Sequence, residues 1–188
     1  MDVALYHVVN GLAGRADWLD TLLRWGATDL PVGFLILLAA TWFWPGTADD
    51  RGRRERLAAY AVAAALLGLG VAQIIAHLWL RDRPYVHHSA TLLVPVSGDP
   101  SFPSDHAVGS FALATPYLLA KRRLGWLLLG AATLLAIARV AVGTHHPSDV
   151  VGGALVGAGA GWLVWRLRGL LERPLVLGLS IAHRFHLA

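Results

Sequence analysis

The chain has 188 residues, of which 56% are apolar and only 15% charged, and its mean hydropathy is +0.54. Soluble domains average about 45–50% apolar and about 25% charged residues, so this composition excludes an ordinary soluble domain and a disordered chain. There is no cysteine, which excludes disulfides, cysteine-bound metals and thiol catalysis. The net charge of +4 suits a nucleic-acid partner, but in a membrane protein an excess of Lys and Arg mostly records orientation.

The first predicted element is an amphipathic helix over Val3–Trp25. It has an apolar face, and Arg15, Asp17, Asp20 and Arg24 interrupt the stretch, so we expect it to lie at the membrane interface. It has no basic start followed by an uninterrupted apolar core, and this argues against a signal peptide.

Five further stretches approach the roughly 17–25 apolar residues that a bilayer core of about 30 Å requires. They are Leu30–Trp44, Leu57–Leu80, Ala107–Ala120, Leu124–Gly143 and Pro147–Trp165. The first is short, which leaves open whether it crosses completely, and a last apolar run, Leu175–Ala182, is too short to span. The glycines of Gly152–Gly161 favour close helix packing. The prediction is an all-α integral membrane helical bundle, with about five transmembrane helices and the interfacial helix in one domain over residues 1–188.

Alternating the loops across the membrane places eleven basic residues on one side and five on the other. The larger set is Arg51, Arg53, Arg54, Arg56, Lys121, Arg122, Arg123, Arg166, Arg168, Arg173 and Arg184. The positive-inside rule puts this set in the cytoplasm. The N-terminal helix, the 81–106 loop and the 143–148 turn are then expected to face outside.

Polar residues form three groups, each at the outer end of a predicted span, where ionisable residues are costly and are functional candidates. In the third group His145 and Asp149 are spaced i, i+4, which puts a carboxylate within reach of an imidazole on a helix. Such a carboxylate fixes the imidazole tautomer and leaves the other ring nitrogen free to attack. Arg139 offers a forked donor to a phosphate. The alternative is a buried Arg139–Asp149 ion pair with His145 as a helix cap.

The other two groups are less specific when taken alone. Ser104 suits a helix N-cap whose free amides bind an anion, and His106 in the same turn can donate a proton. Arg81 and Arg83 precede Pro84. An ordinary cap, an interfacial histidine and snorkelling arginines would explain these residues equally well. The coincidence of all three groups on one face favours a functional site.

At these residues the chain resembles the type 2 phosphatidic acid phosphatase superfamily. That family shows Lys, six residues, Arg-Pro; then Pro-Ser-Gly-His; then Ser-Arg, five residues, His, three residues, Asp. The corresponding residues here are Arg83-Pro84, then Pro103-Ser104-Asp105-His106, then Ala138-Arg139, His145 and Asp149. Order and spacing agree, and the resemblance covers the chain from about Leu57 to Trp165.

The chain departs from the family pattern at the Lys position, which is Ala76, with Arg81 the nearest candidate to replace it. It also has Asp105 and Ala138 where the family has Gly and Ser. The aspartate at 105 and the Phe-Pro before Ser104 resemble the bacterial bacitracin-resistance branch, which consists of undecaprenyl-diphosphate phosphatases.

The resemblance implies a lipid phosphatase that needs no metal or other cofactor. In this family pattern His145 attacks phosphorus to form a phosphohistidine, Asp149 orients it and His106 protonates the leaving group. We expect His87, His88 and His146 to be bystanders or rim residues. His146 is the rival to His145, but it lies three residues from Asp149 and does not match the motif. The implied phosphate-binding residues are Arg83, Arg139, Ser104, Asp105 and Arg81. The implied substrate is a long polyprenyl diphosphate, cleaved to the monophosphate at the outer face of the bacterial plasma membrane, which recycles the cell-wall lipid carrier and confers bacitracin resistance.

Three alternatives stay open. A phosphatidylglycerophosphate or phosphatidate phosphatase would share this catalytic set. A zinc site could use histidines 87, 88, 106, 145 and 146, although the arginines repel a cation. A non-catalytic lipid-binding or transport protein is supported by Ala76. A nucleic-acid partner is disfavoured because the basic residues follow the loops and form no continuous stripe. Lipid chain length and oligomeric state are not set by these patterns.

Overall fold

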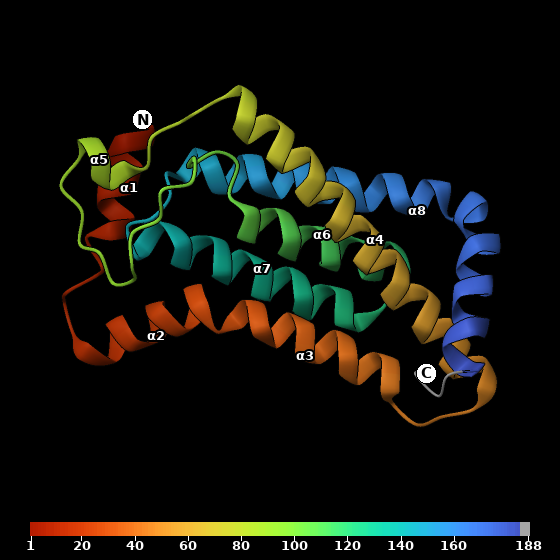
Figure 1. The fold of residues 1–188 in the computed structure, drawn as a ribbon. Coiled ribbons are helices and arrows are strands. Elements are labelled where there is room, and N and C mark those ends of the chain that lie inside the picture. The colour runs from red at the N-terminus through yellow and green to blue at the C-terminus, as the bar shows by residue number, and fades with distance from the viewer. Residues whose placement is uncertain (185–188) are drawn as a thin grey trace.

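The computed structural model describes residues 1–184, and within them it contains helices and no strands, which confirms the all-α prediction (Figure 1). The helices are α1 (Asp2–Asn10), α2 (Asp17–Thr28), α3 (Leu30–Phe43), α4 (Ala48–Leu78), α5 (Pro84–His87), α6 (Asp105–Leu119), α7 (Arg123–Ala141) and α8 (Pro147–Arg184).

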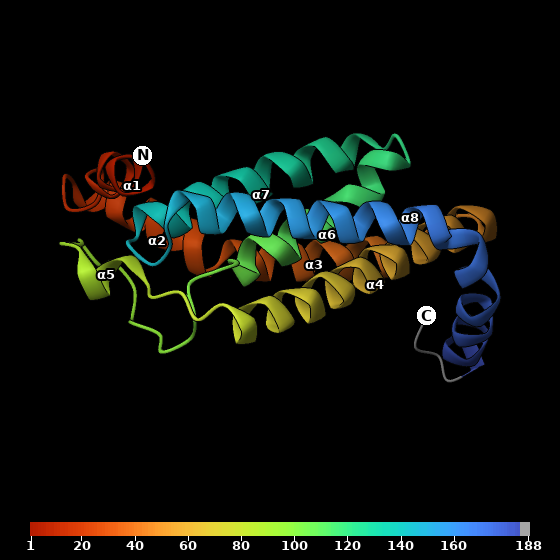
Figure 2. The same cartoon turned by 90° about the horizontal axis from the view of Figure 1, so that it is seen from above.

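Helix α6 occupies the centre of the bundle, where it contacts α4, α7 and α8 (Figures 1 and 2). The approach of α8 requires glycine. A Cβ on Gly157 would lie 2.2 Å from the carbonyl oxygen of Val108, and one on Gly153 would lie 2.7 Å from that of Ser104. Helices in lipid associate mainly through such close van der Waals packing, because lipid removes the hydrophobic drive between them. The predicted packing role of the glycine-rich stretch is therefore confirmed at these two positions.

The helices able to cross a membrane are fewer than the five predicted. Among residues 1–184, α4, α7 and α8 up to Glu172 are long and apolar enough, and α2 with α3, bent by 51° at a short break, makes a fourth. Helix α6 coincides with a predicted span but has only 15 residues, or about 22 Å at 1.5 Å per residue. Helix α6 packs against the longer helices α4, α7 and α8, which surround it in the bundle. The chain is a multi-pass membrane protein.

The prediction of a single N-terminal helix is wrong. The chain breaks at Gly14, whose φ of +78° is a left-handed conformation that glycine adopts without strain. The Gly14 amide donates to Asp20 Oδ1 at 2.8 Å, which fixes the turn before α2. The buried residues of α1 are Tyr6 and Asn10 rather than an apolar stripe, because α1 packs its polar-tipped side chains against the bundle.

The two ends of the bundle differ. At one end α1, α5, the 79–104 segment and the 142–146 turn gather. At the other end α4 begins and α6 meets α7, and the last turns of α8 run at a steep angle to the rest of that helix (Figures 1 and 2). The three polar groups predicted to share one face therefore lie at the same end.

Replacing Gly157 with leucine is expected to destabilise the bundle severely, because its Cβ would overlap the Val108 backbone, which cannot move aside like a side chain. Gly159 has open space around the same position, so Gly159→Leu is the matched control. Overpacking costs about 1–3 kcal/mol or more, and each kcal/mol lowers Tm by about 2–4 °C in a domain of this size. Thermal unfolding in detergent should show a Tm about 6 °C or more lower for G157L and nearly unchanged for G159L. Equal stability of the two variants would contradict this packing.

Candidate active site

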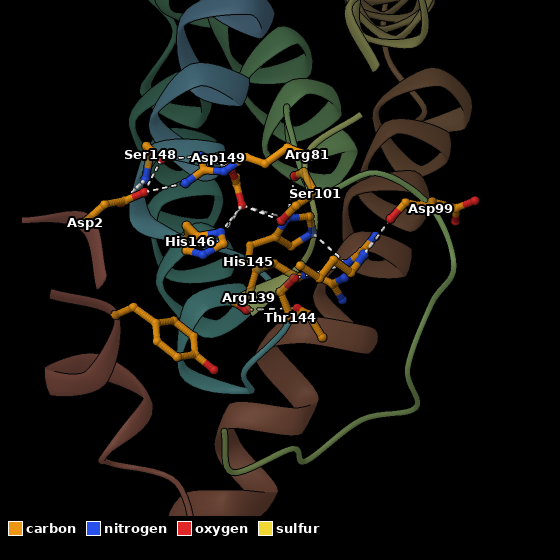
Figure 3. Close-up of polar contacts among 12 residues, drawn as sticks. Asp2, Arg81, Asp99, Ser101, Arg139, Thr144, His145, His146, Ser148 and Asp149 are labelled. Atoms are coloured by element: carbon orange, nitrogen blue, oxygen red, sulfur yellow. Dashed lines mark hydrogen bonds and ion pairs between the residues drawn. The ribbon is translucent and has the colours of Figure 1, made fainter. Parts of the chain in front are cut away.

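Three segments meet at the start of α8 (Figure 3). The first follows α4 and carries Arg81 and Arg83. The second precedes α6 and carries Ser101 and Ser104, and the third is the turn between α7 and α8, which carries His145. The polar side chains of these segments form one connected set of contacts.

Asp149 is fully buried in the first turn of α8. Arg81 Nη1 donates to its Oδ1 at 2.6 Å. Its Oδ2 accepts from Ser101 Oγ at 2.5 Å and from the His146 amide at 2.7 Å. A buried carboxylate is costly unless it is paired and hydrogen-bonded, and here both requirements are met. The carboxylate thereby joins the three segments.

His145 is 2% exposed, and its Nδ1 lies 2.9 Å from the carbonyl oxygen of Ser101 and 3.7 Å from Asp149 Oδ2. A carbonyl only accepts, so the proton sits on Nδ1 and the lone pair on Nε2. The tautomer is therefore fixed mainly by Ser101, where the spacing predicted Asp149. Burial lowers the pKa of His145 to about 4, and the charges of Arg139 and Arg83 lower it further against the hydrogen bond and charge of Asp149. The imidazole is neutral at physiological pH, with Nε2 available as a nucleophile.

Three more side chains supply hydrogen-bond donors to this part of the molecule, and two of these donors have no partner among the described residues. Arg83 is fixed by bonds to the carbonyl oxygens of Asp99 (2.9 Å) and Thr144 (3.2 Å), and its Nη1 lies 3.4 Å from His145 Nε2. Ser104 Oγ and Arg139 Nε are buried and have no hydrogen-bond partner among the described residues. Ser104 precedes α6 as predicted, but its hydroxyl makes no capping bond. Unpaired buried polar groups cost roughly 1–3 kcal/mol each, and a phosphate would satisfy both.

His106 lies in the first turn of α6, within electrostatic range of His145, Arg83 and Arg139. It also borders an apolar cavity of about 400 Å³ between α3, α4 and α6. The imidazole therefore lies between the arginines, Arg83 and Arg139, and the apolar cavity. A proton donor there can reach the oxygen that links a bound phosphate to an apolar chain.

Two residues predicted to bind phosphate are placed differently. The guanidinium of Arg81 donates to Asp149 Oδ1, to Ser148 Oγ at 2.6 Å and to Asp2 Oδ2 at 2.7 Å. Asp105 accepts from Gln73 Nε2 at 3.1 Å, at the cavity rather than among the arginines. Arg81 is oriented by two carboxylates, the buried Asp149 and the partly exposed Asp2. Asp105 is an acidic side chain, whose charge repels a phosphate.

His146, predicted to be a bystander or rim residue, is buried. Besides its amide bond to Asp149, its Nδ1 lies 3.3 Å from Asp149 Oδ2. Burial lowers its pKa, and the charges around its ring are those of Asp149, Arg81 and Asp2. Arg83 and Arg139 are the cations around His145. This difference favours His145 over His146 as the residue that meets a phosphate.

Ser101 and Asp2 were missed by the sequence patterns. Asp2 Oδ1 accepts from the Ser148 amide at 3.0 Å, and its Oδ2 accepts from Ser148 Oγ at 2.5 Å as well as from Arg81. Asn10 adds a second connection from α1, because its Nδ2 donates to the carbonyl oxygens of Thr91 and Ala141. Asn10, a polar residue on the buried face of α1, was the sequence signal that α1 is attached to the site.

No group of three or more His, Asp or Glu side chains within residues 1–184 is arranged to hold a metal ion. His87 pairs instead with Asp82, at 2.7 Å between Nε2 and Oδ2. The zinc alternative therefore has no ligand set in this part of the chain.

Comparison with known proteins gives one family. Residues 56–173 match the model of the PAP2 superfamily. Undecaprenyl-diphosphatase BcrC of Bacillus subtilis is 31% identical over 176 residues, which are 94% of this chain and 88% of that protein. Putative undecaprenyl-diphosphatase YbjG of Escherichia coli is 31% identical over 173 residues, or 90% of this chain and 85% of the relative.

Two solved structures share the fold. LpxE of Aquifex aeolicus superposes with a TM-score of 0.67 at 23% identity, covering 88% of this chain and 94% of its own. A PAP2-type phosphatidylglycerolphosphate phosphatase from Bacillus subtilis has a TM-score of 0.61 at 22% identity, covering 92% and 85%. At these identities the likeness concerns the fold alone.

Replacing Asp2 with alanine is expected to lower turnover about 3–10-fold with little change in KM, because Arg81 and Ser148 lose an acceptor worth about 0.5–1.5 kcal/mol. Asp2→Asn keeps an acceptor oxygen and should fall between alanine and wild type. Asp17→Ala, in the first turn of exposed α2, is the control and should retain wild-type turnover. Steady-state phosphate release measures all three. Full activity of D2A would show that the contacts of Asp2 with Arg81 and Ser148 do not support the site.

Proposed function

Because this chain belongs to the PAP2 superfamily, we propose that it is an undecaprenyl-diphosphate phosphatase that uses His145 as nucleophile. The names of the relatives in Bacillus subtilis and Escherichia coli, which align over most of both chains, support this substrate. One observation carries the proposed chemistry: the neutral imidazole of His145 has its proton fixed at Nδ1 by Ser101 and its Nε2 beside Arg83.

In the first step His145 Nε2 attacks the terminal phosphorus. A nitrogen–phosphorus bond forms, the bond from phosphorus to the bridging oxygen breaks, and His106 protonates the departing lipid monophosphate. Burial, with the charges around the ring, lowers the pKa of His106 to about 4, so His106 takes up this proton beside the bound diphosphate, whose negative charge favours the charged imidazole. The imidazole becomes cationic, and Asp149, 3.7 Å from Nδ1, stabilises that charge. Arg83 and Arg139 hold the phosphoryl oxygens and neutralise charge that a metal ion supplies in other phosphoryl-transfer enzymes.

In the second step water attacks the phosphohistidine. His106, now neutral, takes a proton from the water as the nitrogen–phosphorus bond breaks. Inorganic phosphate leaves and His145 returns to its neutral form. The Ser101 carbonyl remains the acceptor for Nδ1 throughout, so the nucleophile keeps one orientation through both steps.

The apolar cavity beside His106 suits the lipid chain. Its walls come from α3, α4 and α6, and its lining includes Phe34, Leu66 and Gly109. A long isoprenoid chain lying there would end at His106 with its diphosphate directed towards Arg83 and Arg139. The basic residues of the other end support a plasma-membrane orientation with this site on the outer side.

The test is phosphate release from undecaprenyl diphosphate in detergent containing EDTA. Wild type is expected to release phosphate, and His145→Ala is expected to lose at least about 10³-fold in rate, as removal of a nucleophile does. His87→Ala is the control, since that ring is exposed and paired with Asp82, and it should keep full activity. Equal rates for wild type and H145A would reject His145 as nucleophile.

The same assay separates the alternatives. Faster release from phosphatidylglycerophosphate or phosphatidate than from the polyprenyl diphosphate would support a glycerolipid phosphatase. Lipid binding without release from any of these substrates would support a non-catalytic protein. Loss of activity in EDTA with rescue by zinc would support metal catalysis.

Filling the apolar cavity is expected to discriminate by chain length. Gly109 lines it and has no heavy atom within 4 Å of its Cβ position, so Gly109→Phe places a ring in the space without disturbing the backbone. We expect kcat/KM for undecaprenyl diphosphate to fall about tenfold or more, and that for a much shorter isoprenoid diphosphate to change less. Gly130→Phe, in an equally open position on α7, should change neither. An equal loss for both chain lengths would contradict the tail-binding role.

A further inference from the structure

A second cavity lies at the end of the bundle opposite His145. It measures about 430 Å³ and lies between the start of α4, the α6–α7 turn and α8 (Figure 1). Basic side chains from all three elements border it: Arg53, Arg56, Lys121, Arg122 and Arg168. The proposed reaction uses none of them.

Some of these basic side chains form ion pairs or ring contacts within the protein, and these contacts hold the side chains that line the cavity. Glu172, the acidic residue of the lining, accepts from Tyr60 Oη at 2.8 Å and lies 3.7 Å from Arg56 Nε. The guanidinium of Arg168 packs over the ring of Trp165 at 4.5 Å. Arg53 pairs with Asp50, which is outside the cavity. The contacts of Tyr60 and Arg56 with Glu172 join α4 to α8, and the lining keeps a net positive charge.

Lys121 and Arg122 form no ion pair with any residue that the structure describes. Backbone contacts hold the turn that carries them. The Lys121 amide donates to Leu118 at 2.8 Å and the Arg122 amide to Tyr117 at 3.0 Å. Gly125 packs so closely on this turn that a Cβ there would lie 2.5 Å from the Leu118 nitrogen. Two unpaired cations are therefore presented at a fixed place.

The apolar part of the lining and the size of the cavity indicate which kind of anion would bind there. The rest of the lining is aromatic and aliphatic, with Tyr60 and Trp165 next to Leu57 and Leu119. The volume falls in the range of about 300–1,000 Å³ that small-molecule sites occupy, which is more than a lone phosphate ion fills. Basic pockets between transmembrane helices bind anionic lipid head groups. The cavity lies at the end of the bundle where α4 begins and α6 meets α7, which the positive-inside rule assigns to the cytoplasmic surface.

We propose that this cavity binds the head group of an anionic phospholipid in the leaflet opposite the catalytic residues. The phosphate lies between Lys121 and Arg122, and the acyl chains extend along the outside of the bundle. The lipid is a ligand and not a substrate, because the lining has no histidine, serine or threonine, and its one tyrosine, Tyr60, donates its hydroxyl to Glu172. Binding stabilises the folded protein, since the head group bridges α4, the α6–α7 turn and α8.

The test is lipid titration of the full chain in detergent, followed by thermal unfolding. Phosphatidylglycerol is expected to raise Tm, whereas phosphatidylcholine and inorganic phosphate are not. The variant Lys121→Gln/Arg122→Gln should bind phosphatidylglycerol about 30-fold more weakly, because each basic residue near a membrane surface contributes about fivefold. Arg51→Gln/Arg123→Gln removes the same charge at the same end from residues that do not line the cavity, and it should keep wild-type affinity.

Each other result would overturn the proposal. Equal losses in the two double variants would mean diffuse attraction to the basic surface. An equal Tm rise with inorganic phosphate would mean an anion site without lipid selectivity, and no rise with phosphatidylglycerol would mean no site. The Tm of each variant without lipid reports its folding, since exposed Lys121 and Arg122 should be replaceable without loss. The readout needs no hydrolysis, so it stands apart from the proposed function.

Discussion

The burial of one carboxylate governs the arrangement of the whole site. Asp149 has no solvent exposure, so its charge must be met by protein groups. Those groups come from the segment after α4, the loop before α6 and the turn before α8. The Ser104 amide also donates to the Asp149 carbonyl at 3.1 Å, which joins the starts of α6 and α8. One buried charge thus brings together the loops that carry the proposed nucleophile and the arginines proposed to bind phosphate.

Helix packing in the membrane makes this gathering possible. Because α6 and α8 meet backbone to backbone at Gly153 and Gly157, their N-termini lie together and set Ser104 beside Asp149. The short α6 leaves an apolar cavity against α3 and α4 that reaches His106. The same packing therefore provides both parts of the proposed substrate site, a polar pocket for the diphosphate and an apolar space for its chain.

Sequence spacing predicted the contacts between residues that are close in the chain. It did not predict contacts between segments that are far apart in the chain. The i, i+4 spacing of His145 and Asp149 brought the two together, and the order of the loops placed the polar groups at one end. The role of Ser101 was missed because its carbonyl, a group that every residue has, orients His145. Arg81 was predicted to bind phosphate because the sequence does not show that α1, which ends before the turn at Gly14, brings Asp2 to its guanidinium. With Ala76 at the family Lys position and Arg81 paired with Asp149 and Asp2, Arg83 and Arg139 are the cations that we propose to bind phosphate.

The central claim is that His145 carries the phosphoryl group between the two steps, and trapping that intermediate tests it most directly. Wild-type protein mixed with undecaprenyl diphosphate labelled at the terminal phosphate, then quenched in alkali, should carry an alkali-stable, acid-labile phosphate. Peptide mapping should place that phosphate on His145. A label on His146, or turnover with no protein-bound phosphate at any quench time, would contradict the account.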